Sequence, residues 1–215
     1  MMYARTLIFG IAVLVPLTAG AGRWVPRFFA YAAMLWLVAG TVYTVLLRKS
    51  PELVAERMKP PSDRDRASRR IAIPLMLAHY FLAGLDARFG WSSVPAALQI
   101  AGFAAAGGAL AIVGWTLLSN PYASTAVRIQ SERGHTVIST GPYAVVRHPM
   151  YFAVLLYGLG SGPALGSWWS MLALLPVLIV FVRRTLVEDR MLRDELPGYD
   201  AYAQRVRYRV LPGIF

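Results

Sequence analysis

The sequence predicts an all-α, polytopic bundle of membrane helices, and three observations support this prediction. Hydrophobic residues make up 57% of the 215 residues and charged residues 15%, whereas soluble domains carry about 25% charged residues. Apolar runs long enough to cross a bilayer recur along the chain. Arginine and lysine stand between these runs instead of lining one face. Together these features exclude a soluble enzyme, a disordered tail and a secreted disulfide-rich fold.

Four segments reach the length of roughly 20 apolar residues that a bilayer core requires. They are 6–21, 28–47, 71–89 and 95–118. The stretch 149–182 is long enough for two helices, and its Gly-Ser-Gly-Pro sequence at 160–163 predicts a tight turn. We therefore expect five to six membrane segments, the last two forming a helical hairpin. This divides the chain into a four-helix transmembrane region, 1–118, and a C-terminal region, 119–215.

The basic residues predict the orientation of the bundle. The net charge of +11 would normally indicate a nucleic-acid partner, but 19 of the 22 Lys and Arg residues lie on one side of the predicted membrane. By the positive-inside rule that side, which includes both termini, is the cytoplasm. We therefore expect contacts with membrane lipids and none with nucleic acid. The absence of cysteine excludes disulfides, Cys-ligated zinc and a thiol nucleophile, and we expect no metal site.

The first four segments contain few interior polar residues. His79 lies inside the third segment and is expected to be a packed, hydrogen-bonded core histidine. Asp86 is expected near the membrane surface beside Arg88. In the fourth segment small residues recur at helical spacing, which predicts a close helix–helix contact along that face. These residues are Ala97, Ala101, Ala104, Gly108 and Ala111.

The chemistry-bearing residues gather in the last hundred positions. The stretch 134–151 is too polar to span a membrane, and Pro149 is suited to the first position of the next helix. Arg147 and His148 would then stand at a helix N-terminus, where an anionic or carboxylate-bearing ligand is favoured. After the hairpin, Arg184 and Glu188 are four residues apart and share one helical face. The tyrosines among the arginines of the tail are expected to anchor it at the membrane interface. They are Tyr199, Tyr202 and Tyr208.

The order of these motifs resembles the superfamily of isoprenylcysteine carboxyl methyltransferases and phospholipid methyltransferases. The likeness covers about 119–215, and the first four segments match only as generic helices. No single tripeptide is specific, but the ordered series is. The series consists of His135-Thr136-Val137-Ile138, Gly141-Pro142-Tyr143, Arg147-His148-Pro149-Met150-Tyr151, Arg184, Glu188-Asp189, Tyr199-Asp200-Ala201-Tyr202 and Leu211-Pro212.

The resemblance implies a pocket for S-adenosylmethionine, open to the cytosol, between the hairpin and its flanking loops. A lipophilic or lipid-anchored acceptor would enter from the bilayer. Glu188 and Asp189 match the family's acidic pair, with Asp189 shorter than the second glutamate, and Arg184 matches the arginine before the pair. The remaining cofactor-binding residues implied by position are His135, Val137, Ile138, Gly141, Tyr143, His148 and Tyr151.

The function that the resemblance implies is methyl transfer by an integral, multi-pass membrane enzyme, most readily to a carboxylate of the isoprenylcysteine type. Methyl transfer to a carboxylate depends more on the alignment of donor and acceptor than on acid–base catalysis. Arg184 and Glu188 are the expected catalytic residues: Arg184 would pair with the acceptor carboxylate, and Glu188 would hold the donor or fix Arg184. Tyr143 and Tyr151 would contact adenine or the sulfonium. The expected location is a bacterial inner membrane, with the site facing the cytoplasm.

Several alternatives stay open at this stage. The acceptor could be a phospholipid amine, a small-molecule thiol or a hydroxyl instead of a carboxylate. An NADPH-dependent sterol-type reductase is a second enzymatic reading, and a membrane scaffold or small transporter is a non-enzymatic one. The oligomeric state and the separate roles of Arg183 and Arg184 are also open.

Overall fold

The computed structural model describes residues 2–58, 63–125 and 128–214, and it describes the side chains of 8–58, 70–125 and 128–214. The described elements are α-helices and two short 3-10 helices, and no strand occurs among these residues. In chain order they are α1 (Met2–Ala21), α2 (Pro26–Lys49), α3 (Pro51–Met58), α4 (Asp63–Phe89), α5 (Ala96–Ser119), η1 (Ser131–Arg133), η2 (Gly141–Ala144), α6 (Pro149–Leu165), α7 (Trp168–Ala173), α8 (Leu175–Glu195) and α9 (Tyr199–Arg205).

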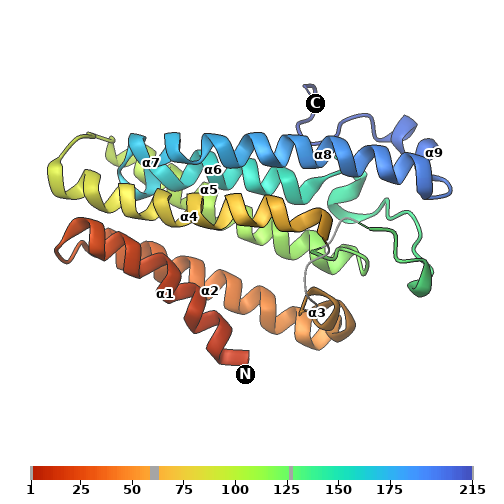
Figure 1. Cartoon of the computed structure of the whole chain (residues 1–215), viewed down its shortest axis with the longest axis horizontal. Helices are drawn as coiled ribbons and strands as arrows, with labels where there is room; N and C mark the ends of the chain where they lie inside the picture. Colours follow the sequence, from red (N-terminus) through yellow and green to blue (C-terminus); the bar gives the residue numbers. More distant parts are fainter. Residues whose placement is uncertain (1, 59–62, 126–127, 215) are drawn as a thin grey trace.

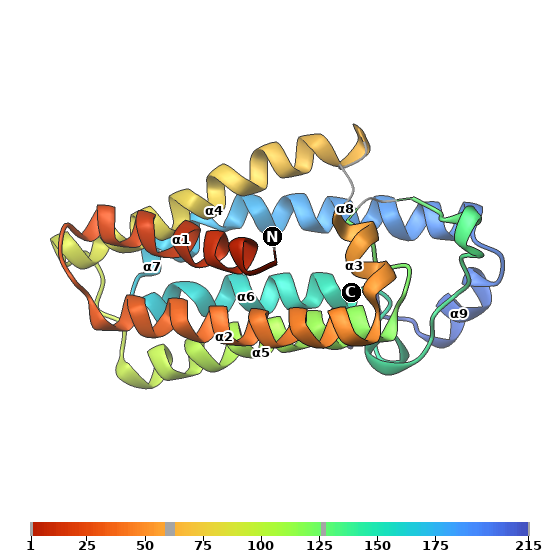
Figure 2. The same ribbon diagram turned by 90° about the horizontal axis from the view of Figure 1, so that it is seen from below.

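The long helices lie side by side along one axis, and their connections gather at two ends (Figures 1 and 2). At the turn end are the connections α1–α2, α4–α5 and α6–α7. At the loop end are α3, the connection between α5 and α6, and α9 (at the right of Figure 1). The predicted all-α bundle is confirmed, and the polar residues that the sequence analysis singled out after the fourth segment are concentrated at the loop end.

The predicted membrane segments agree closely with the helices. Four helices are long and apolar enough to cross a membrane: Pro26–Lys49, Arg70–Phe89, Ala96–Ser119 and Trp168–Glu195. Ile8–Ala21 is a shorter apolar helix, and α6 has 17 residues. These lengths and compositions are those of an integral membrane protein.

The position of the hairpin turn was predicted wrongly. Residues 160–163 lie inside α6, which continues to Leu165 and ends at Gly166 with a positive φ of 74°. The glycines serve packing instead of turning. A Cβ on Gly160 would lie 2.7 Å from Ala105 Cβ, and a Cβ on Gly102 would lie 2.5 Å from Ala164 N. Helices α5 and α6 therefore approach so closely that both positions require glycine.

This contact also uses a different face of α5 from the one expected. Ala97, Ala101, Ala104 and Ala111 are exposed, whereas the buried glycines and alanines are Gly102, Ala106, Ala109 and Gly114. Small side chains occur on several faces of α5, so spacing alone does not identify the face that packs.

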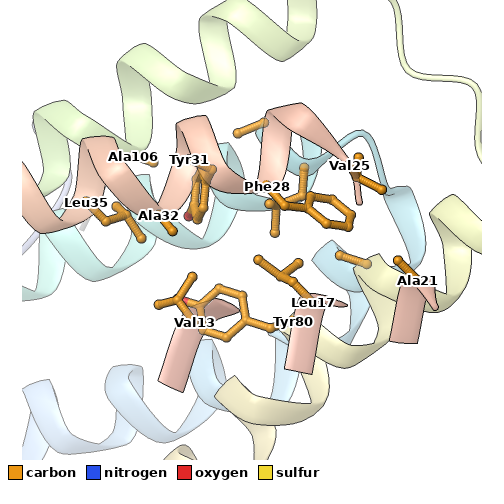
Figure 3. Close-up of a cluster of buried hydrophobic side chains, with 13 residues drawn as sticks. Val13, Leu17, Ala21, Val25, Phe28, Tyr31, Ala32, Leu35, Tyr80 and Ala106 are labelled. Atoms are coloured by element: carbon orange, nitrogen blue, oxygen red, sulfur yellow. The ribbon is translucent and has the colours of Figure 1, made fainter. Parts of the chain in front are cut away.

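The main hydrophobic core joins α1, α2 and α4 near the turn end (Figure 3). Leu17, Phe28 and Tyr31 are fully buried there. Helices α1 and α4 meet at Gly20 and Gly84: a Cβ on Gly84 would lie 2.3 Å from Leu17 O. This packing fixes the N-terminal helices against one another, and Leu165 from the end of α6 joins the same core.

His79 has the packed environment that the sequence predicts. Its Nδ1 lies 2.8 Å from Ser170 O and its Nε2 lies 2.7 Å from Ser161 Oγ. Because a carbonyl only accepts, Nδ1 carries the proton and Nε2 accepts from the serine. Ser161 also bonds the Tyr31 hydroxyl at 2.6 Å, so this network ties α2, α4 and α6 together.

The expectation for Asp86 is right about its place near the end of α4 and wrong about its surroundings. Its side chain is buried and accepts hydrogen bonds from the Ser92 backbone N–H at 2.7 Å, the Ser92 hydroxyl at 2.6 Å and the Ser167 hydroxyl. Because Ser92 lies in the α4–α5 connection and Ser167 caps the start of α7, Asp86 holds the α4–α5 and α6–α7 connections together at the turn end.

Candidate active site

A cavity of about 380 Å³ lies at the loop end of the bundle. Its walls come from α3, the end of α5, the connection between α5 and α6, the first turns of α6, the last turns of α8, and α9. A cavity of this size falls in the range of small-molecule sites. It brings residues from both halves of the sequence to one place.

Polar side chains of the connection shape the wall between α5 and α6. Asn120 ends α5; its Oδ1 accepts from Tyr122 N at 2.8 Å and its Nδ2 donates to the Tyr143 hydroxyl at 2.9 Å. Gln130 is buried, and its Nε2 donates to Tyr122 O at 2.6 Å. The connection is thus held by its own hydrogen bonds, although it has little regular secondary structure.

Gly141 has a structural role beside this wall. It begins η2 with a φ of 60°, a region that favours glycine. A Cβ there would lie 2.4 Å from Ser119 Oγ. Gly141 therefore lets η2 pack against the end of α5 and places Tyr143 at the cavity, although Gly141 itself does not line it.

Most of the residues predicted for the site line this one cavity. Gly141 and Asp189 are the two predicted residues that lie outside its lining. The predicted residues that line it are His135, Val137, Ile138, Tyr143, His148, Tyr151, Arg184 and Glu188.

Arg184, Tyr151 and Glu188 form a chain of hydrogen bonds on the wall. Arg184 Nε donates to the Tyr151 hydroxyl at 2.9 Å, and that hydroxyl donates to Glu188 Oε2. Arg184 Nη2 also donates to Thr125 O at 2.8 Å. The two predicted catalytic residues are therefore bridged by tyrosine, and Glu188 keeps 28% of its side chain exposed.

His148 lies at the start of α6, as predicted, with Pro149 as the first helical residue. Its Nε2 is 3.1 Å from Asp189 Oδ1 and its Nδ1 is 3.8 Å from Glu188 Oε1. Burial disfavours the charged imidazole, but the hydrogen bond to Asp189 and the charges of both carboxylates outweigh it and raise the pKa of His148. His148 thus stands between the acidic pair.

Arg147 is among the residues that line the cavity, but its guanidinium is engaged by protein groups. Its side chain is 2% exposed. Its Nε and Nη2 donate to the two oxygens of Asp189 at 2.8 and 3.1 Å. Its Nη1 donates to Val206 O and Arg207 O at 2.9 and 2.8 Å. The anionic group that Arg147 attracts is therefore Asp189, and this explains why the predicted basic helix N-terminus is not an open anion site.

Two tail tyrosines were placed wrongly by the sequence. Tyr199 and Tyr202 are buried and line the cavity, whereas Tyr208 is exposed. Tyr202 donates from its hydroxyl to Tyr143 O at 2.8 Å. Their spacing of three residues puts both on one face of a helix, and that was the signal available for an inward-facing pair.

Helix α3 contributes to the cavity without any signal in its sequence. Arg57 lines the wall, and its Nη1 donates to Ala123 O at 2.7 Å. Glu56 is buried and accepts from Arg128 Nη2 at 2.7 Å. Leu53 packs in a small core with Leu46 and Leu117. The first half of the chain thus helps to close the site.

The cavity suits a small ligand that carries both an aromatic ring and a positive charge. Tyr143 and Tyr151 offer aromatic surfaces, which attract rings and cations. Glu188 offers a partly exposed carboxylate beside them. Among the residues that the structure describes, no group of three possible metal ligands occurs.

Comparison with known proteins agrees with this geometry. The phospholipid methyltransferase family matches residues 98–196, which run from α5 to the end of α8. Over 82 residues the chain is 32% identical to the cobalt-zinc-cadmium resistance protein CzcN of Cupriavidus metallidurans. That match covers 37% of this chain and 38% of the relative, so the chain spans well under half of the relative's length. The family match confirms the resemblance seen in the sequence: residues 98–196 match the phospholipid methyltransferase family, part of the isoprenylcysteine carboxyl methyltransferase-like superfamily.

Proposed function

We propose that this protein is an integral-membrane methyltransferase that uses S-adenosylmethionine and methylates a lipophilic acceptor. The observation that carries the proposal is that eight of the ten predicted site residues line one cavity at the loop end. The favoured acceptor is a carboxylate of the isoprenylcysteine type. The match of residues 98–196 to a methyltransferase family supports the reaction class.

The cofactor would be held by the aromatic and acidic walls. Tyr143 and Tyr151 would contact its adenine or sulfonium, and Glu188 would accept hydrogen bonds from its ribose or ammonium group. When bound, S-adenosylmethionine supplies an electrophilic methyl group on a positively charged sulfur. His135 lines the same cavity. Burial and the nearby Arg133 charge lower the pKa of His135, which favours a neutral ring beside a cationic ligand.

The acceptor would be oriented by Arg184 and by the apolar part of the cavity. Arg184 is anchored by Tyr151 and Thr125 O, so its guanidinium would meet an acceptor carboxylate in a fixed position. The apolar lining from the membrane helices would receive the hydrocarbon part. It comprises Val113, Met150, Val154 and Phe181.

The proposed orientation places the loop end in the cytoplasm of a bacterial inner membrane. Nineteen of the 22 Lys and Arg residues lie in the segments that lead to this end, and cytoplasmic loops carry such an excess. Cytosolic S-adenosylmethionine would then reach the cavity directly. Accessibility of the loops in oriented vesicles tests this assignment.

The test of the function is cofactor binding by the purified protein in lipid nanodiscs, followed by transfer to candidate acceptors. Calorimetry should show saturable binding of S-adenosylmethionine that Glu188→Gln weakens and that Asp194→Asn, an exposed change on the same helix, leaves unchanged. Mass detection should then find a methyl ester on a prenylcysteine. Absence of saturable binding, or displacement by NADPH, would contradict the proposal.

A phospholipid amine is the second candidate acceptor, because the matched family bears that name. An amine must lose a proton during methylation, and His148 lines the cavity beside Glu188, where it could accept one. An assay that offers phosphatidylethanolamine in parallel with a prenylcysteine separates the two candidates, since only the true acceptor would gain the mass of a methyl group.

A further inference from the structure

The buried carboxylate of Asp189 connects three parts of the chain at the loop end. The first is residues 147–148 at the start of α6, the second is α9, and the third is the tail segment, defined here as residues 206–210. In the tail segment, Tyr208 O and Arg209 O accept from Arg147 N at 3.0 Å and from His148 N at 2.8 Å. Val210, at the end of this segment, is 2% exposed.

Both oxygens of Asp189 are occupied by protein groups. Oδ1 accepts from Arg147 Nε at 2.8 Å, from the Tyr199 hydroxyl at 3.0 Å and from His148 Nε2 at 3.1 Å. Oδ2 accepts from Arg209 Nε at 3.0 Å, Arg147 Nη2 at 3.1 Å and Arg193 Nε at 3.5 Å. A carboxylate has about four lone-pair sites, so these donors saturate it. Asp189 has no capacity left for a ligand.

Glu188 and Asp189 therefore differ, although they are neighbours in sequence. Glu188 lines the cavity with 28% of its side chain exposed, whereas Asp189 is 3% exposed and outside the cavity lining. Because Asp189 accepts from His148 Nε2, it sets which nitrogen carries the proton and leaves Nδ1 directed toward Glu188.

We propose that Asp189 is a positioning residue that latches the tail segment onto residues 147–148 and so holds His148 at the cavity wall. The importance of that wall for methyl transfer rests on the proposed function, but the latch does not. The prediction that Asp189 binds the cofactor directly is thereby replaced by an indirect role.

The chain contains no cysteine, so Val210→Cys introduces a single thiol that reports on the latch. In the otherwise unchanged protein this thiol should react slowly with a maleimide because the side chain is buried. Asp189→Asn removes the charge from six hydrogen bonds and should raise the labelling rate about tenfold or more. Glu188→Gln and Asp194→Asn, on the same helix, should leave the rate unchanged.

A second readout separates positioning of His148 from general loosening. The chain has three histidines, so ¹⁵N-imidazole spectra resolve them. Asp189→Asn should shift the His148 signals and leave those of His79 in place, which also shows that the variant is folded. Arg209→Gln, which removes only the tail's side of the latch, should raise labelling with a smaller change at His148.

The outcomes are distinguishable. Unchanged labelling and unchanged His148 signals in Asp189→Asn would overturn the latch. Unchanged labelling with lost S-adenosylmethionine binding would also overturn it, in favour of direct cofactor contact. Faster labelling in a protein whose parent binds no S-adenosylmethionine would support the latch and contradict the proposed function.

Discussion

The Tyr151 hydroxyl is the sharpest point at which to perturb the proposed site, because it joins Arg184 to Glu188. Tyr151→Phe removes this bridge and keeps the ring, which stacks on His148 with centroids 5.7 Å apart. Without the hydroxyl, Arg184 keeps its hydrogen bond to Thr125 O, but Arg184 and Glu188 each lose a contact that orders them, and the ligand has to supply that order. Ordering a side chain costs roughly 0.5–1.5 kcal/mol, so two cost about 1–3 kcal/mol and should raise the Kd for S-adenosylmethionine about 5- to 150-fold.

Calorimetry on wild type and Tyr151→Phe in nanodiscs measures this change. Tyr157→Phe is the matched control, since it lies on the same helix and its hydroxyl bonds Tyr31 at 2.9 Å and Tyr80 at 2.5 Å, away from the cavity. It should lower the thermal midpoint and leave the Kd unchanged. A Kd for Tyr151→Phe within twofold of wild type would refute the bridging argument.

Three further predictions concern stability, each read as a thermal unfolding midpoint in detergent. Gly102→Ala should destabilise by about 1–3 kcal/mol through overpacking, since its Cβ would lie 2.5 Å from Ala164 N, whereas Gly108→Ala meets open space; equal effects would contradict the close contact. The folded-state pKa of His148 is raised. The stabilisation that His148 gives the folded state is therefore complete below a pH of about 6.5, the pKa of histidine in the unfolded chain, and is lost as the pH rises through the folded-state pKa. The gap between wild type and His148→Gln should therefore narrow with rising pH, and a widening gap would reverse the assigned sign. Glu56→Gln should cost about 1–2 kcal/mol because it removes the charge of the buried carboxylate that pairs with Arg128. Glu52→Gln, at a side chain 90% exposed, should cost under about 0.5 kcal/mol, and similar losses at both positions would show that α3 is not held by the Glu56–Arg128 pair.

The membrane helices were predictable because length and apolar composition determine them. The segments predicted at 28–47 and 95–118 correspond to helices at Pro26–Lys49 and Ala96–Ser119. The hairpin turn was not predictable from glycine and proline alone, since these residues also permit close helix contact. Gly160 lies within α6 and packs against Gly102 of α5, and the chain turns only at Gly166.

Most of the residues that the sequence predicted for the candidate site line the described cavity, but the sequence did not predict how they are arranged. The family's motif order placed His135, Tyr151 and Glu188 together, and all three line the cavity. The sequence could not show that Asp189 faces the protein interior, because the two acidic neighbours differ only in the direction of their side chains. It also could not show that Arg57 reaches the cavity. Arg57 precedes its partner Ala123 by 66 residues, and α3 lies outside the family match.

The contacts of α3 have a consequence for engineering hybrids of this protein. Arg57 donates a hydrogen bond to Ala123 O, and Glu56 accepts one from Arg128. Helix α3 and the connection between α5 and α6 therefore have to be complementary. Exchanging the first 118 residues for those of another protein would separate partners that must match. A productive chimera should transplant α3 with the stretch it holds, or leave both in place, and junctions chosen by hydropathy alone would cut through the pair.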